Sequence, residues 1–158
     1  MTPEAGRVLA GVERVFDTPR PSWFCNARHC CECAEHEATL QAHTRETLDF
    51  QAVGSPAWDP VTFISNPDGF KHLLPALARL AFGRGNAYYL DTFVFQLRHD
   101  RILTFTDEQK RALEDLLLHL AVELDDEIRD YDWPEIEWVL RRLRGEAGPA
   151  TYAGGWAP

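Results

Sequence analysis

Apolar side chains recur every three or four residues along most of this chain, which is the spacing of one face of an α-helix. The pattern is clearest after Thr106, where a stripe of leucines continues for several turns; it comprises Leu113, Leu116, Leu117, Leu120 and Leu124. Thr106 and Gln109 have the spacing of a capping box, in which two side chains satisfy free amides at the start of a helix. A helix is therefore predicted from Asp107 to about Leu124.

The same spacing predicts five other helices, bounded by Pro, Gly and capping residues. They cover about residues 3–16, 26–48, 66–83, 86–97 and 134–145. The segment from Val61 to Ser65 is β-branched and aromatic but has no second strand to pair with, so we expect a short extended connector there. The predicted fold is all-α: a single-domain bundle of about six helices over residues 1–145, followed by a flexible C-terminal tail over residues 146–158.

The length and composition of the chain indicate a globular protein. A chain of 158 residues buries a hydrophobic core without needing disulfides or a structural metal. No apolar run approaches the roughly 18 residues that cross a bilayer, and residues 1–16 lack the basic start and unbroken apolar stretch of a signal peptide. We therefore expect a soluble protein in the reducing cytoplasm, where its four cysteines remain thiols.

The balance of charge bears on the class of partner. The chain has 16 Lys and Arg against 25 Asp and Glu, which gives a formal net charge of −9. This excess of acids disfavours nucleic acid and anionic membrane as partners and favours a basic protein.

Many of the acids gather between Glu123 and Glu137, and three large aromatic residues lie between Glu123 and Trp138. Aromatic anchors surrounded by charges of one sign are typical of protein-binding surfaces. The alternative is that the aromatic residues close the core beneath a solvated acidic face. The predicted partner-binding residues are Glu123, Asp125, Asp126, Glu127, Asp130, Tyr131, Asp132, Trp133 and Trp138.

The stretch HCCECAEHE, which runs from His29 to Glu37, is the main candidate for chemistry. Zinc prefers four ligands in a tetrahedron and takes them from thiolate and imidazole groups. The candidate ligands are Cys25, His29, Cys30, Cys33 and His36. On one continuous helix, ligands from Cys25 to His36 would spread over roughly 16 Å, so a single helix can offer two of them but rarely four.

A zinc site therefore requires Cys30 and Cys33 at the start of a helix and a third ligand from the loop before it, at Cys25 or His29. The fourth ligand would have to come from a distant group, such as His72, His119 or a carboxylate. Two other interpretations stay open. Cys30 and Cys33 could form a redox pair at a helix N-terminus, or the cysteines could pack as small apolar side chains while the histidines make local hydrogen bonds.

The order of these motifs resembles that of a protein family. A short N-terminal helix precedes the Cys30-x-x-Cys33 segment with its following acids, and then come the blocks WDPVTFISNPDGFKHLLPAL and FTDEQKRALEDLLLHL. In this order the chain resembles a family of small uncharacterised bacterial proteins over about residues 8–124. The resemblance implies no known activity, and it does not extend to the acidic region after Glu123.

Two classes of function follow from these observations. The first is a non-enzymatic acidic protein that binds a basic protein partner, for which an immunity protein or antitoxin that neutralises a toxin fits the size and charge. The second is a small zinc-binding or thiol-redox module that uses residues 25–36. Catalysis is not indicated, because His119, one turn after Asp115, has no nucleophile identifiable beside it and is better interpreted as a salt-linked histidine on a helix surface.

Overall fold

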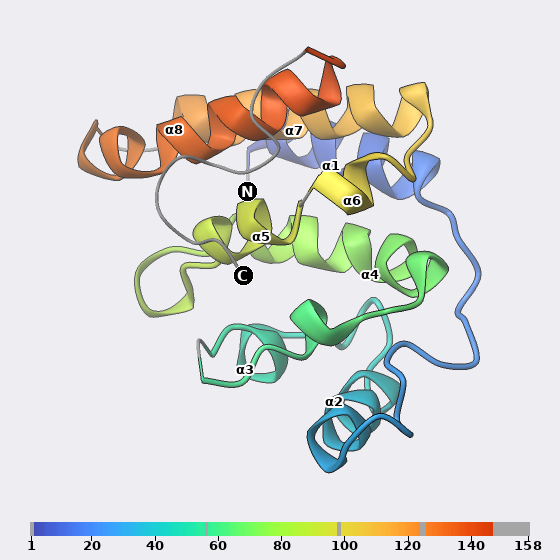
Figure 1. The fold of residues 1–158 in the computed structure, drawn as a ribbon. Helices are drawn as coiled ribbons and strands as arrows, with labels where there is room; N and C mark the ends of the chain where they lie inside the picture. The colour runs from blue at the N-terminus through green and yellow to red at the C-terminus, as the bar shows by residue number, and fades with distance from the viewer. Residues whose placement is uncertain (1, 56, 98, 124–125, 147–158) are drawn as a thin grey trace. The chain divides into compact units, whose positions relative to one another are not determined.

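The computed structural model describes residues 2–55, 57–97, 99–123 and 126–146. Within these ranges every regular element is helical, which confirms the all-α prediction (Figure 1). The α-helices are α1 (Pro3–Val15), α2 (Cys31–Gln41), α3 (Phe50–Val53), α4 (Pro67–Leu80), α5 (Leu90–Gln96), α6 (His99–Ile102), α7 (Asp107–Glu123) and α8 (Asp126–Leu143). Two 3-10 turns, η1 (Pro60–Phe63) and η2 (Gly85–Ala87), complete the described elements.

The contacts within the chain divide it into two compact units. The first unit comprises the residues up to Val15 together with those from Leu97 onward, and the second comprises Phe16–Gln96. The predicted C-terminal tail lies outside the described residues from 147 onward. No described helix is long and apolar enough to span a membrane.

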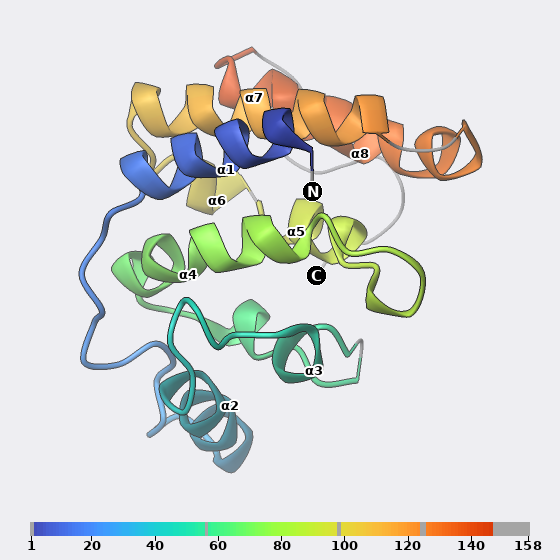
Figure 2. The ribbon, with the colours of Figure 1, turned by 180° about the vertical axis from the view of Figure 1, so that it is seen from behind.

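In the first unit, α7 packs against α1 and against α8, so the leucine stripe contacts helices on both sides (Figure 2). The stripe is fully buried at its described positions Leu113, Leu116, Leu117 and Leu120. The predicted capping box is confirmed, because the Thr106 amide donates to Gln109 Oε1 at 3.0 Å and the Gln109 amide donates to Thr106 Oγ1 at 3.2 Å. Gln109 Nε2 also donates to the carbonyl of Val15 at 3.0 Å, which joins the end of α1 to the start of α7.

The last helix begins earlier than the sequence pattern predicted. It starts at Asp126, and Pro134, the predicted first residue, lies inside it. Residues 126–133 are mostly polar and show no clear apolar stripe, so the sequence pattern did not indicate the earlier start. The predicted end is confirmed: Gly145 has a φ of 73°, the left-handed conformation that glycine adopts most readily at a helix C-terminus.

In the second unit, two elements of the structure differ from those that the sequence predicted. The extended connector is wrong over most of its length, because Pro60–Phe63 is the 3-10 turn η1 and only Ile64 after it is extended. Asp59 accounts for the difference: its carboxylate accepts the amide of Val61 at 3.1 Å and the hydroxyl of Thr62 at 2.7 Å, which caps the turn. This capping overrides the β-propensity of the side chains.

The helix predicted over residues 26–48 is shorter at both ends, and α2 covers only Cys31–Gln41. Beyond Ala42, the Thr44 amide donates to the Thr47 hydroxyl at 2.8 Å and the Thr47 amide lies 3.3 Å from the Thr44 hydroxyl. Threonine hydroxyls that bond nearby backbone groups compete with helical hydrogen bonds, so the helix does not continue. The predicted start of α4 is confirmed, because the Asn66 side chain accepts the amide of Asp68 at 3.1 Å.

Candidate metal centre

The loop that precedes α2 is held in place by the carboxylate of Glu37. Its Oε2 atom accepts the backbone amides of Phe24 and Cys25 at 2.8 and 2.6 Å. On the other side of the loop, the Phe24 carbonyl accepts the amides of Ser65 and Asn66, both at 3.1 Å. The loop is therefore tied both to α2 and to the residues that begin α4.

A tight turn then brings the chain back to the start of α2. The Ala27 amide donates to the Cys25 carbonyl at 2.9 Å, and the His29 amide donates to the Asn26 carbonyl at 2.9 Å. Cys30 follows as the N-cap of α2, with extended backbone angles, and its Sγ atom accepts the Cys33 amide at 3.3 Å. A thiol thus takes the capping position that Ser, Thr, Asp or Asn usually fills.

This local geometry brings three potential metal ligands together. Cys30 Sγ and Cys33 Sγ lie 3.2 Å apart, and Cys33 Sγ lies 3.4 Å from His29 Nδ1. The three ligand atoms all lie within 4.8 Å of one another, and no other such group of His, Cys, Asp or Glu occurs in the described part of the chain. Zn–S bonds of about 2.3 Å and a Zn–N bond of about 2.0 Å in a tetrahedron would place the sulfurs about 3.8 Å apart and sulfur about 3.5 Å from nitrogen. The Cys30–Cys33 and Cys33–His29 distances therefore differ from those of a tetrahedral zinc site by about half an ångström or less.

The two thiols of the cluster differ in acidity. The pKa of Cys30 is lowered, first by the backbone amide of Cys33 and then by hydrogen bonds with the Cys33 thiol and the His29 ring. The pKa of Cys33 is raised, first by its hydrogen bond with Cys30 and then by burial. Cys30 therefore loses its proton first and carries the thiolate, the form that binds metals and reacts with electrophiles.

The exposure of the cluster leaves one side open to solvent. His29 and Cys30 are exposed, while Cys33 is 8% exposed and lies on the inner face of α2. Cys31 is also exposed, next to the cluster but outside the group of converging atoms. Two of the three potential ligands therefore face solvent, and the third is buried against the protein.

The other predicted metal ligands of the second unit have separate roles. Cys25 is buried, and its thiol donates to the Pro60 carbonyl at 3.9 Å. His36 is 1% exposed and is packed between the rings of Trp58 and Phe63, at centroid distances of 4.3 and 4.2 Å. The sequence suggested either residue as a ligand, but Cys25 points into the core and His36 joins α2 to η1.

The two more distant candidates for a fourth ligand also make their own contacts. His72 is buried, and its Nδ1 atom lies 2.8 Å from the Thr18 carbonyl, to which it donates. Burial lowers the pKa of His72, so the ring is held in its neutral form. His119 belongs to the first unit, where its Nε2 atom lies 3.2 Å from Glu123 Oε1.

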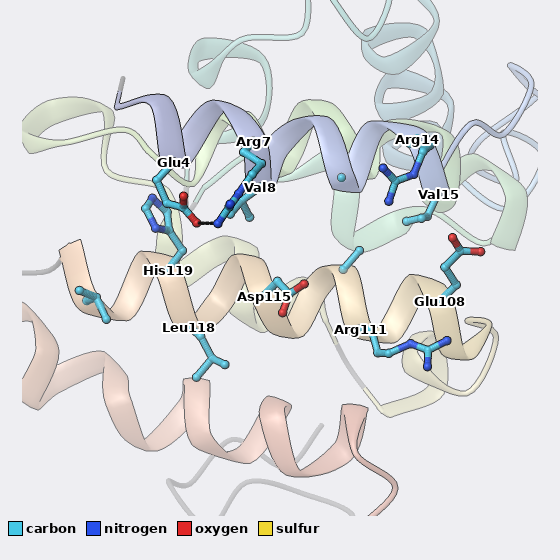
Figure 3. Close-up of a pocket in the computed structure, with 13 residues that line it drawn as sticks. Glu4, Arg7, Val8, Arg14, Val15, Glu108, Arg111, Asp115, Leu118 and His119 are labelled. Carbon is cyan, nitrogen blue, oxygen red and sulfur yellow. Dashed lines mark hydrogen bonds and ion pairs between the residues drawn. The ribbon is translucent and has the colours of Figure 1, made fainter.

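The first unit contains a groove of about 810 Å³ between α1 and α7 (Figure 3). Charges of both signs line it, including the ion pair of Arg7 with Glu4 and the side chains of Asp115 and His119. No Ser, Thr, Cys or Lys is among the residues that line it. The His119 ring lies beside the Glu123 carboxylate, at 3.2 Å, and not beside Asp115 as the sequence suggested.

Only part of the predicted partner-binding surface can be placed. Asp125 lies outside the described residues, as do the side chains of Asp126, Glu127, Asp130 and Tyr131. Their role stays a prediction.

Among the described members, Glu123 pairs with His119, and Trp138 is half-buried beneath the Arg142 guanidinium at 5.4 Å from its ring. Trp133 is 37% exposed. Asp132 was predicted to be part of the exposed partner-binding surface, but it is only 3% exposed. It precedes the fully buried Ile136 by one helical turn and so lies on the inner face of α8.

No protein-family model, curated protein or solved structure matches this chain. The resemblance to small bacterial proteins stays a prediction, and the function has to be argued from the geometry of the site.

Proposed function

We propose that this protein binds one zinc ion through His29 Nδ1, Cys30 Sγ and Cys33 Sγ. The observation that carries the proposal is the convergence of these three atoms within 4.8 Å at the start of α2. Two thiolates and one imidazole are a ligand set that suits zinc, whereas calcium and magnesium prefer oxygen ligands. The fourth position would take water or a ligand from outside the chain.

The surroundings of the cluster support metal binding in two further ways. The lowered pKa of Cys30 provides a thiolate without the full cost of removing a proton at neutral pH. Glu37 holds the loop that delivers His29, in the manner of the outer groups that orient metal ligands. Zinc would also neutralise the two thiolates that would otherwise repel each other at this distance.

Metal content of the purified protein tests the proposal. After incubation with zinc chloride under reducing conditions and desalting, the wild-type chain should retain close to one equivalent of zinc by elemental analysis. The variants Cys30→Ser, Cys33→Ser and His29→Asn should each lose most of this zinc. Cys31→Ser is the matched control, because Cys31 is an exposed neighbouring thiol outside the converging group, and it should retain the metal.

Two results would contradict zinc binding at this site. One is a wild-type chain that retains less than about a tenth of an equivalent, since a working site of this kind should be nearly filled. The other is a Cys31→Ser variant that loses as much zinc as Cys30→Ser, which would indicate unspecific binding by exposed thiols.

The exposed face of α8 supports a second, independent proposal, namely that it binds a basic protein. The observation that favours it is that Trp133, 37% exposed, lies one turn before Glu137 on the same face. Glu137 has 47% of its side chain exposed and pairs with the exposed Arg141 at 3.1 Å, so a cationic partner would compete with Arg141 for this carboxylate. An aromatic anchor beside a carboxylate suits a cationic partner.

A synthetic peptide of lysines and leucines can serve as the probe for this second proposal. Trp133→Ala should weaken its binding, and Trp23→Ala, which removes a 45% exposed tryptophan from the other unit, is the matched control. Equal affinity for wild type and Trp133→Ala would contradict the proposal.

A further inference from the structure

The two sulfur atoms of the metal cluster are also placed to react with each other. Cys30 Sγ and Cys33 Sγ lie 3.2 Å apart, and a disulfide has an S–S distance of about 2.05 Å. Cys30 is the N-cap of α2: its carbonyl accepts the Ala34 amide at 3.1 Å, but its backbone angles are extended, so its side chain can approach Cys33 without unwinding the helical turns. A bond between them would remove both thiolate ligands from the site.

The other two cysteines do not compete for this bond. Cys25 is 2% exposed and its thiol is engaged with the Pro60 carbonyl, which keeps it from an oxidant in solution. Cys31 is exposed but lies outside the group of converging atoms. Cys30 is exposed and Cys33 is the sulfur that contacts it, so the geometry selects one pair.

We propose that hydrogen peroxide converts Cys30 and Cys33 to a disulfide and thereby releases the zinc ion, which makes this a redox-controlled metal site. The inference rests on the zinc binding proposed above and adds the regulation of that site. Thiolates bind zinc through their negative charge, and a disulfide has none, so His29 alone would remain as a ligand.

The chemical steps balance with peroxide as the oxidant. The Cys30 thiolate attacks one peroxide oxygen, so an S–O bond forms, the O–O bond breaks and hydroxide leaves. The Cys33 thiolate then attacks the Cys30 sulfur, so the S–S bond forms, the S–O bond breaks and a second hydroxide leaves. The two sulfurs lose two electrons in total, and the peroxide is reduced to two hydroxide ions.

The test uses the full-length chain loaded with zinc, with its metal content measured before peroxide is added. A zinc-binding dye then follows release, and peptide mass spectrometry locates the disulfide. We expect one zinc released for each Cys30–Cys33 disulfide, and a thiol reductant followed by fresh zinc should restore the loaded site. Cys31→Ser should behave as wild type, because its thiol takes no part.

The outcomes separate this inference from the zinc proposal itself. Zinc that is bound at the start and stays bound while peroxide oxidises other residues would overturn the redox control and leave zinc binding intact. Release accompanied by sulfinic acid or by a disulfide to Cys31 would likewise overturn it. A chain without zinc before peroxide is added would overturn both proposals.

Discussion

Helix α7 and the cysteine segment, which we define as residues 22–41, are held in the protein by different forces. The buried face of α7 is a stripe of leucines, and its start is capped by Thr106 and Gln109. The cysteine segment has few buried apolar side chains and depends on polar side chains that bond backbone groups far away in the sequence. Glu37 accepts two amides of the loop, and Arg20 donates to the carbonyls of Gln41 and His43 at 2.8 and 2.6 Å.

This difference indicates where each region is vulnerable. A leucine stripe shares its stabilisation among many contacts, and the loss of one side chain leaves a cavity within a core that otherwise stays packed. The loop before α2 loses its tie to that helix when the Glu37 carboxylate is removed, because two backbone amides lose a charged acceptor. Substitutions in the leucine stripe should therefore lower the free energy of unfolding most. Substitution of Glu37 should lower the affinity of the proposed site for zinc most.

The largest effect is expected in the stripe. Leu116→Ala should lower the free energy of unfolding by about 2–5 kcal/mol, because it deletes a fully buried side chain and leaves a cavity. Urea denaturation followed by circular dichroism measures this change. Leu118→Ala on the same helix is the control, since Leu118 is 39% exposed and its loss should have little effect. Equal losses for the two variants would show that the stripe does not carry the stability of α7.

Removal of the Glu37 carboxylate should lower stability less than a leucine substitution does, and it should weaken zinc binding more. Glu37→Ala should lower the free energy of unfolding by about 1–3 kcal/mol, because two amides lose a charged acceptor. It should also weaken zinc binding about tenfold or more, since groups that orient metal ligands have effects of this size. Calorimetric titration with zinc measures the affinity, and Glu35→Ala, an exposed acid on the same helix, should keep it. Unchanged affinity in Glu37→Ala would show that the loop keeps its place without the carboxylate.

A fall in pH should lower the stability of the wild-type protein more than that of a variant without His72. The pKa of His72 is lowered by burial, so the unfolded chain takes up the proton first as the pH falls. The stability from neutral His72 is complete above the usual histidine pKa of about 6.5 and declines as the pH drops below it toward the folded-state pKa. His72→Asn, which can still donate to the Thr18 carbonyl, should show a weaker decline between pH 7 and pH 5 in denaturation curves. Identical declines would assign the acid sensitivity to other groups.

The smallest expected effect is a difference in reactivity that leaves the fold unchanged. In metal-free protein the lowered pKa of Cys30 and the raised pKa of Cys33 should make Cys30 react with iodoacetamide at a lower pH. Mass spectrometry of peptides after brief labelling across a pH series gives the two profiles. If Cys33 were labelled first, the hydrogen bond from its amide to Cys30 would not be setting the order.

The two regions also differ in how well the sequence predicts them. Helix α7 follows from local information, because its stripe, its capping box and its bounds are all visible in neighbouring residues. The start of α8 was missed because the residues before Pro134 are mostly polar and show no clear stripe. Likewise, η1 depends on Asp59, whose capping role has no distinct signal among other acids in the sequence.

The group of His29, Cys30 and Cys33 was predicted in outline, and tertiary contacts decided which loop residue joins it. The sequence indicated Cys30 and Cys33 at a helix start with a loop ligand from Cys25 or His29, and the structure has this arrangement with His29. The choice depends on Glu37, which bonds the Cys25 amide while the Cys25 side chain points into the core. Nothing in the sequence separates Glu37 from the other acids after the cluster, so a local pattern could not have identified it.

The closeness of His29, Cys30 and Cys33 along the chain has a consequence for how zinc and folding are linked. Ligands so near each other can be brought together at little entropic cost even in an unfolded chain. A metal stabilises a fold only by the difference between its affinities for the folded and unfolded states, so tight zinc binding here should raise the melting temperature little. The ion could be captured by the growing polypeptide on the ribosome, before the helices that follow have been synthesised. The proposed site would then form first from a short stretch of chain, and contacts such as those of Glu37 would strengthen it once the protein has folded.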